Sequence, residues 1–244
     1  MVRAGLAPAP DAMYASLGDG VVELLDLSVR DPSPRIDAVE LEEALLAELA
    51  MPGPVVFLAS HTGNWELGAA ALARHRRLHI VAKRISSRGF DAFMAQLRTR
   101  LGIHVIPPAG ALAAARTALR EGGAVALPID QVPDREAHAL RVPFLGAEAL
   151  VDRAPATLAV RAGARMLVVA AEREEGVHRI RLLGALAPEP EETARRTIDR
   201  TTREATRLLD AFVRARPGGW LWLHRRWRAP RPCPSATTRL VPSP

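Results

Sequence analysis

Residues 55–66 read VVFLASHTGNWE, and this stretch decides the class of fold. Its five apolar residues, Val55 to Ala59, have the length and composition of a buried strand. Ser60 to Asn64 include a glycine and form a turn, and a helix is expected from Trp65 to His75. A buried strand that leads through a tight turn into a helix is the repeating unit of α/β proteins.

The same alternation continues on both sides of this stretch. A helix is predicted from Ile36 to Leu49, and it ends at Pro52-Gly53-Pro54. Residues 130–150 are predicted to form one long irregular segment, a kind of loop that often carries function. The sequence therefore predicts an α/β fold with a mixed, mostly parallel sheet flanked by helices. The further predicted helices are Phe90–Arg100, Ala111–Arg120, Pro155–Ala162 and Glu191–Arg214, and the further predicted strands are His79–Ala82, Ile103–Ile106, Ala124–Ile129, Arg165–Ala171 and Val177–Leu183.

The composition is that of one ordinary globular domain. The chain has 244 residues, of which 48% are hydrophobic and 25% charged, so global disorder is excluded. Its single cysteine, Cys233, excludes an intrachain disulfide. We expect one domain over 1–229, with N-terminal helices over 13–50, an α/β core over 54–229 and a disordered proline-rich tail over 230–244. No run approaches the roughly 18–20 apolar residues of a membrane helix, so we expect no transmembrane segment in this chain.

The basic residues gather near the C-terminus. The formal net charge is +6, and Ala211 to Pro244 hold seven arginines and no acidic residue. Here Trp220, Trp222 and Trp227 interleave with arginines, a pattern typical of membrane interfaces and also of single-stranded nucleic acid binding. Trp220 and Trp222 fit equally well on a strand that turns both side chains into the core.

His61 and Glu66 lie on the turn between the first strand and its helix. On a regular helix five positions separate two side chains by about 140°, but across a strand–turn–helix junction they can meet. A carboxylate that holds one ring nitrogen of a histidine fixes its tautomer, and the other nitrogen can then take a proton from a hydroxyl. The spacing alone fits equally well a surface histidine and an acid that complements the helix dipole.

Four blocks of sequence, in the same order, resemble one family. The segment VVFLASHTGNWELG resembles the H-x4-[DE] block of the lysophospholipid acyltransferase superfamily, and H-x-G-N-W-E resembles its lipid A late acyltransferase branch. The segment VAKRISSRGFDAFMAQLRTRLG resembles the second block of the family. The segments ALPIDQ and RVPFLG together resemble the third block, and GGWLWLHRRWR resembles the last. The resemblance covers roughly Met13 to Arg228 and implies a glycerolipid acyltransferase-like fold.

The resemblance also implies a role for each candidate residue. His61 would be the general base on an acceptor hydroxyl, and Glu66 would orient it. Arg98 and Asp130 would contact substrate or support the site, and Lys83 with Arg84 would bind a phosphate. The catalytic candidates are thus His61, Glu66, Arg98 and Asp130, and the substrate-binding candidates are Asn64, Lys83, Arg84 and Gln131. No metal, cofactor or covalent enzyme intermediate is expected: the chain has no H-E-x-x-H metal site and no G-x-S-x-G nucleophile elbow.

The implied activity is O-acyl transfer from acyl carrier protein, or from acyl-CoA, to a hydroxyl of a glycolipid acceptor of the lipid A type. The implied place is the cytoplasmic face of the bacterial inner membrane, where this chain would attach peripherally to an anionic surface. Two alternatives stay open. One is acylation of another lipid, such as a lysophospholipid, an aminolipid or a mannosylated lipid. The other is a non-catalytic basic module that binds membrane or nucleic acid, although no nucleic acid partner is expected.

Overall fold

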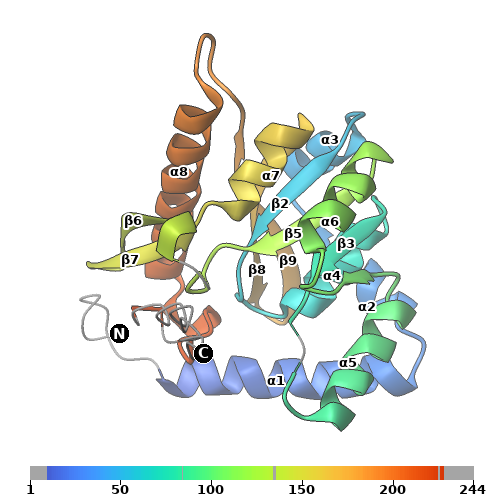
Figure 1. Cartoon of the computed structure of the whole chain (residues 1–244). Helices are drawn as coiled ribbons and strands as arrows, with labels where there is room; N and C mark the ends of the chain where they lie inside the picture. Colours follow the sequence, from blue (N-terminus) through green and yellow to red (C-terminus); the bar gives the residue numbers. More distant parts are fainter. Residues whose placement is uncertain (1–9, 84, 134–135, 225, 228–244) are drawn as a thin grey trace, which may run out of the picture.

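The computed structural model describes residues 10–83, 85–133, 136–224 and 226–227. Its centre is a seven-stranded sheet in the order β1-β9-β8-β2-β5-β3-β4 (Figure 1). The neighbouring strands pair in parallel, except β8 and β9, which are antiparallel. The predicted fold class, a mixed and mostly parallel sheet flanked by helices, is therefore confirmed. The strands of this sheet are β1 (Glu40–Leu41), β2 (Val55–Ala59), β3 (Leu78–Val81), β4 (His104–Ile106), β5 (Ala124–Pro128), β8 (Arg165–Glu174) and β9 (Val177–Leu186).

Helices cover both faces of the sheet. One apolar cluster joins Val56 and Leu58 of β2 to α6, α7 and α8, and a second joins Val55 and Phe57 to α1, α3, α4 and α5. These four side chains are at most 1% exposed, which explains why β2 is an unbroken apolar run. The helices are α1 (Pro10–Val29), α2 (Ser33–Asp37), α3 (Glu43–Ala50), α4 (Trp65–Ala73), α5 (Arg88–Arg100), α6 (Ala111–Arg120), α7 (Ala154–Ala162) and α8 (Ala194–Ala215), with short 3₁₀ turns η2 (Glu136–His138) and η3 (Pro217–Gly219).

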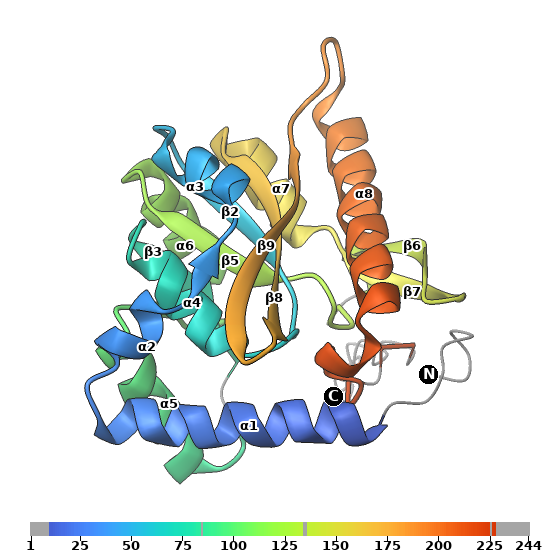
Figure 2. The ribbon, with the colours of Figure 1, turned by 180° about the vertical axis from the view of Figure 1, so that it is seen from behind.

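Helix α1 lies across one end of the sheet. Figure 2 shows it running beneath the strands, with η3 near one of its ends and α5 near the other. The helix is 20 residues long, in spite of Gly18 and Gly20. Within the described residues, no helix has both the length and the apolar character needed to cross a bilayer.

The predicted helix Ile36–Leu49 is wrong, because β1 interrupts it. Glu40 and Leu41 pair in parallel with β9, and the adjacent Glu42 binds Arg181 and the backbone N–H of Leu182. This tertiary pairing holds residues 40–42 extended and leaves α2 and α3 as separate helices. Helical spacing of the apolar residues could not reveal a pairing with a strand 140 residues away.

The predicted irregular segment over 130–150 is also wrong in its second half. Residues there form an antiparallel hairpin of β6 (Ala139–Phe144) and β7 (Ala147–Asp152). Its two-residue turn is Leu145-Gly146, with φ of 50° and 80°. Leucine is a poor turn residue at positive φ, but here its side chain is fully buried and its N–H donates to Asp210 of α8.

The other predicted elements exist, with ends that differ by a few residues. The helix Ala111–Arg120 has the predicted bounds, whereas β8 and β9 are longer than expected. The predicted long helix begins at Ala194 rather than Glu191, because Thr193 caps it by accepting from the N–H of Arg196. The tail 230–244, predicted to be disordered, lies outside the described residues.

Candidate active site

The site lies where β2 and β5 end side by side. The two strands are parallel, with Ala59 opposite Pro128, so His61 and Asp130 each follow two residues after paired positions. The carboxylate of Asp130 receives both the backbone N–H of His61, at 2.7 Å, and its ring Nδ1, at 2.9 Å. Because a carboxylate only accepts hydrogen bonds, Nδ1 carries the proton and Nε2 is unprotonated, with the Gln131 amide 3.4 Å away as a weak donor to its lone pair.

Asp130 is fully buried and ionised. Trp220 donates its indole N–H to the same carboxylate, at 3.0 Å. Burial alone would raise the pKa of Asp130, but the contacts with His61 lower it to about 2. For His61, burial alone would lower the pKa, but the charge and hydrogen bond of Asp130 raise it above its ordinary value. The pair therefore has a basic imidazole held in one tautomer.

Glu66 does not hold His61 as predicted, since Asp130 occupies that position. The Glu66 carboxylate, in the first turn of α4, instead binds Arg98 of α5 through two contacts, Nε to Oε2 at 3.0 Å and Nη2 to Oε1 at 2.5 Å. Both side chains are largely buried, at 5% and 15% exposed. The charge of Glu66 still contributes to the raised pKa of His61. The turn directs Glu66 toward α5, while the β2–β5 pairing brings in a carboxylate from 69 residues away.

Removing Arg98 is expected to destabilise the fold strongly. The variant Arg98→Ala leaves the buried Glu66 carboxylate unpaired, and we expect the free energy of unfolding to fall by about 3–5 kcal/mol. A urea titration measures this, with Arg100→Ala on the exposed side of the same helix as the control, for which we expect less than about 1 kcal/mol. Equal losses in the two variants would contradict the paired-charge role.

A second histidine faces His61. The rings of His61 and His224 are 4.5 Å apart between centroids, and the Trp65 ring lies 5.1 Å from His61. Burial lowers the pKa of His224, and its Nε2 is buried without a hydrogen-bond partner among the described residues. Gln131 places Nε2 at 3.4 Å from Nε2 of His61. The sequence reasoning missed His224 as a site residue, although the fourth block of the resemblance contains it.

The described part of the segment GGWLWLHRRWR, near the C-terminus, packs against the turn that carries His61. The N–H of Gly63 donates to Gly219 at 2.8 Å, and the N–H of Leu221 donates to His61 at 2.9 Å. Trp220 is 1% exposed and forms only an isolated bridge with Thr62, so it is a core residue but not part of a strand. This segment therefore supports the turn that carries His61.

The described tryptophans and arginine of this block face inward. Trp222 and Trp227 contact Trp220 and donate their indole N–H groups to backbone carbonyls. Arg226 is 1% exposed, donates to the carbonyls of Leu150 and Gln131, and has its pKa lowered by burial to about 10. Of the two alternatives, the core one therefore holds for these residues, although Trp220 is not part of a strand, and the interface is not formed by them. Arg225 and Arg228 lie outside the described residues.

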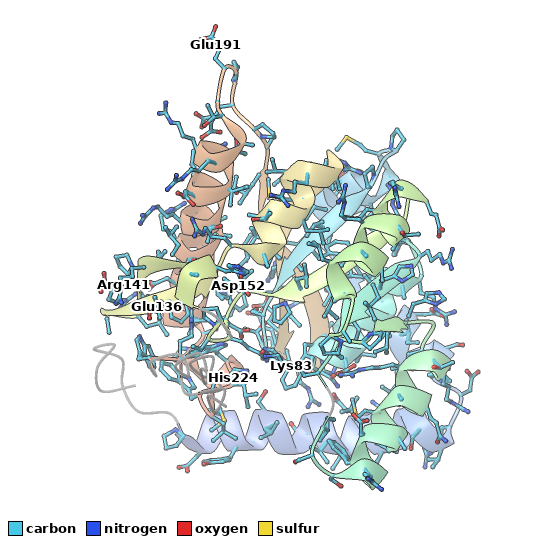
Figure 3. The ribbon with its side chains drawn as sticks, viewed as in Figure 1. Lys83, Glu136, Arg141, Asp152, Glu191 and His224 are labelled. Atoms are coloured by element: carbon cyan, nitrogen blue, oxygen red, sulfur yellow. The ribbon has the colours of Figure 1, made fainter. Side chains whose placement is uncertain are left out.

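The remaining substrate-binding candidates separate into different places. Asn64 is buried and caps α4, with Oδ1 accepting from the N–H of Leu67 at 3.0 Å. Lys83 is exposed beyond the end of β3, and Figure 3 shows it in the same lower region of the molecule as His224. Arg84 lies outside the described residues. Of the predicted residues, the structure thus groups His61, Asp130 and Gln131, with Glu66 and Arg98 as an adjacent pair.

The three residues His61, Asp130 and His224 also offer possible metal ligands, since one ligand atom of each lies within 4.8 Å of the others. Both oxygens of Asp130, however, already accept hydrogen bonds from His61 and Trp220. A metal ion bound at Oδ2 would have to displace the N–H of His61 or of Trp220. The arrangement fits proton transfer better, because every bond to Asp130 comes from a group that stabilises its charge.

A groove of about 1190 Å³ lies elsewhere, between α8 and the β6–β7 hairpin. Its walls include Pro143 and a row of α8 side chains such as Arg196 and Arg203, but none of the site residues described above. Acidic and basic side chains both line it, and it is a surface feature separate from the His61–Asp130 pair.

The structure is thus an α/β protein with a histidine held by a buried carboxylate at the carboxyl ends of parallel strands, an arrangement that can accept a proton from a hydroxyl. The family model of the bacterial lipid A biosynthesis acyltransferases matches residues 10–229, and the chain belongs to this family. The match confirms the family suggested by the four blocks and identifies the protein as an acyltransferase. Comparison with curated proteins found no match.

Proposed function

We propose that the protein transfers a fatty acyl group from acyl carrier protein to a hydroxyl of a lipid A-type glycolipid. The observation that supports this most directly is the 2.9 Å contact between His61 Nδ1 and Asp130, which leaves Nε2 free to accept a proton. The family match supports acyl transfer to a lipid acceptor. We propose the α/β unit over residues 54–229 as the catalytic part, with the helices over 13–50 packed against it.

In the proposed reaction, His61 Nε2 takes the proton of the acceptor hydroxyl while the hydroxyl oxygen attacks the thioester carbonyl carbon. The tetrahedral intermediate then collapses, the carbon–sulfur bond breaks, and the same proton passes from Nε2 to the leaving thiolate. Asp130 stays ionised throughout and stabilises the transient imidazolium. The positive end of α4, directly after the turn, favours the negative charge that develops on the carbonyl oxygen.

The other predicted residues take supporting roles in this proposal. Gln131, 3.4 Å from His61 Nε2, is placed to hydrogen-bond the acceptor hydroxyl. The Glu66–Arg98 pair holds α4 against α5 beside the base. Lys83, together with Arg84, is proposed to bind an acceptor phosphate. An acidic carrier protein fits the formal net charge of +6 of the chain.

We propose that the chain attaches to the cytoplasmic surface of the inner membrane through α1. Five large apolar side chains of this helix are 50–77% exposed, whereas Leu27 faces the core. A helix with such an outward stripe can lie in the headgroup region of a bilayer. The exposed residues are Tyr14, Val21, Val22, Leu25 and Val29.

The double variant Val22→Asp/Leu25→Asp is expected to lose binding to anionic lipid vesicles by tenfold or more, as roughly two apolar side chains leave the lipid. Co-sedimentation with vesicles containing phosphatidylglycerol measures this. Leu112→Asp, at an equally exposed position on α6, is the matched control and should bind as the wild type does. Equal binding by all three proteins would remove α1 as the attachment site.

Turnover of a carrier thioester tests the proposed function. Purified protein is given acyl carrier protein loaded with a C10–C16 chain, together with a total bacterial lipid extract, and the lipids are followed by mass spectrometry. A glycolipid that gains one acyl mass supports the proposal. A lysophospholipid, aminolipid or mannosylated lipid that gains the acyl group would replace the acceptor. A folded protein that binds vesicles or nucleic acid yet acylates nothing would contradict it.

A further inference from the structure

Helix α1 places one carboxylate in the protein interior. Glu23 is 7% exposed and takes no part in the proton transfer described above. Its Oε2 accepts from Nδ2 of Asn64 at 2.7 Å, and its Oε1 lies 2.9 Å from Nε2 of His178 on β9. Arg173 of β8 lies 3.5 Å from Oε1. Helix α1, the turn before α4 and the β8–β9 pair, three regions distant in sequence, therefore meet at this carboxylate.

Glu23 carries its charge at neutral pH. Burial alone would raise its pKa, but the hydrogen bonds from Asn64 and His178 lower it below the ordinary value of a glutamate. Hydrogen bonds to an ionised acceptor are shorter and stronger than those between neutral groups. The contact with Asn64 is thus of the kind that fixes a side chain in one orientation.

The orientation of Asn64 determines which of its atoms caps α4. With Nδ2 bound to Glu23, Oδ1 is directed at the N–H of Leu67, the orphan donor of the helix that begins at Trp65. A rotated amide would present a donor to a donor and lose the cap. Asn64 stands between His61 and Glu66 in the chain, so its orientation controls the turn on which both depend.

We propose that Glu23 is a positioning residue for acyl transfer, acting through Asn64 on the geometry of the turn 61–66. This inference rests on the proposed function and adds α1 to the framework of the active site. The face of α1 opposite to Glu23 carries the apolar stripe, so the helix proposed to touch lipid is linked by one hydrogen bond to the catalytic turn.

The first test compares Glu23→Gln with Asp19→Asn. Both remove one charge from α1, but Asp19 is 61% exposed in its pair with Arg173 and does not touch Asn64. We expect Glu23→Gln to lower kcat by about 10–10²-fold, since small misplacements of catalytic groups have effects of this size, and to leave the KM for the acyl donor within about twofold. Asp19→Asn should keep the wild-type kcat.

Exchanging the acid and the amide between positions 23 and 64 distinguishes a loss of positioning from a general loss of folding. The variant Asn64→Asp sets two carboxylates against each other, although aspartate can still cap α4. In the double variant Glu23→Gln/Asn64→Asp the new amide can donate to the new acid, so we expect kcat to recover at least about tenfold over Asn64→Asp alone. Losses that simply multiply in the double variant would overturn the inference.

A titration of His61 by NMR provides a readout that needs no turnover. In Glu23→Gln we expect the pKa of His61 to fall toward its ordinary value, because the turn no longer holds it against Asp130. If His61 shifts but no lipid is acylated even by the wild type, Glu23 does hold the turn 61–66, and it is the proposed acyl transfer that fails. If the wild type is active and Glu23→Gln changes neither kcat nor the His61 titration, the inference is wrong.

Discussion

Replacement of His61 by alanine is expected to lower kcat for acyl transfer by about 10²–10⁴-fold, with the fold intact. His61 is the residue whose Nε2 is free while Nδ1 is fixed on Asp130, so its loss leaves the acceptor hydroxyl without a base. Asp130 loses the bond from Nδ1 but keeps those from the backbone N–H of residue 61 and from Trp220, so we expect the free energy of unfolding to fall by about 1–3 kcal/mol while the protein still folds. Mass spectrometry of the acylated lipid, with wild type and variant at equal concentration, measures the effect.

His75→Ala is the matched control for this experiment. It removes an exposed imidazole just beyond the end of α4, and we expect it to keep wild-type turnover. Vesicle binding should be unchanged in both variants. A His61→Ala protein that acylates lipid at the wild-type rate would exclude the proposed base, and the non-catalytic binding module would then be the better reading.

Replacement of Asp130 by asparagine is expected to reduce kcat by a similar factor and also to move the pH profile. An amide has one acceptor for the three donors that the carboxylate now binds, so the tautomer of His61 is no longer fixed. In the wild type, kcat/KM should rise with pH through an apparent pKa above the ordinary 6.5 of histidine, because the base acts when neutral.

The shift has a definite sign. In Asp130→Asn the burial that lowers the pKa of His61 remains, but the main attraction that raises it is gone. The acid limb of the profile should therefore move to lower pH, even though the maximal rate falls. Glu121→Gln, which removes an exposed carboxylate from the end of α6, should leave the limb in place. An unchanged limb in Asp130→Asn would show that another group controls it.

The sequence was sufficient to locate the turn that carries His61, but not to identify the carboxylate that binds the His61 ring. The run Val55 to Ala59 and the following glycine turn are local signals, and the strand, turn and helix formed as predicted. The partner of His61 depends on the parallel register of β2 with β5, which no spacing within the turn encodes. Glu66 was the nearest acid in sequence, but Asp130 is the nearest in space.

The sequence could not decide between an interface and a core position for the C-terminal tryptophans and arginines. They form a cationic stretch along the chain, but the order of charges along a chain does not show which side chains are buried. Arg226 is enclosed beside the Phe144 ring, and Trp220 binds Asp130. In the hairpin, too, buried Leu145 replaced the usual turn residues, so tertiary packing overrode the local signal.

The order in which a ribosome makes this chain has a consequence for when activity can begin. His61 and Asp130 emerge early and bind each other, yet Trp220 also binds Asp130, Leu221 binds His61, and Gly219 binds the neighbouring Gly63. A nascent chain that has passed β9 already possesses base and carboxylate but lacks this final brace. The acyltransferase is thus expected to be inert throughout its synthesis and to gain its activity only when its last block has been translated.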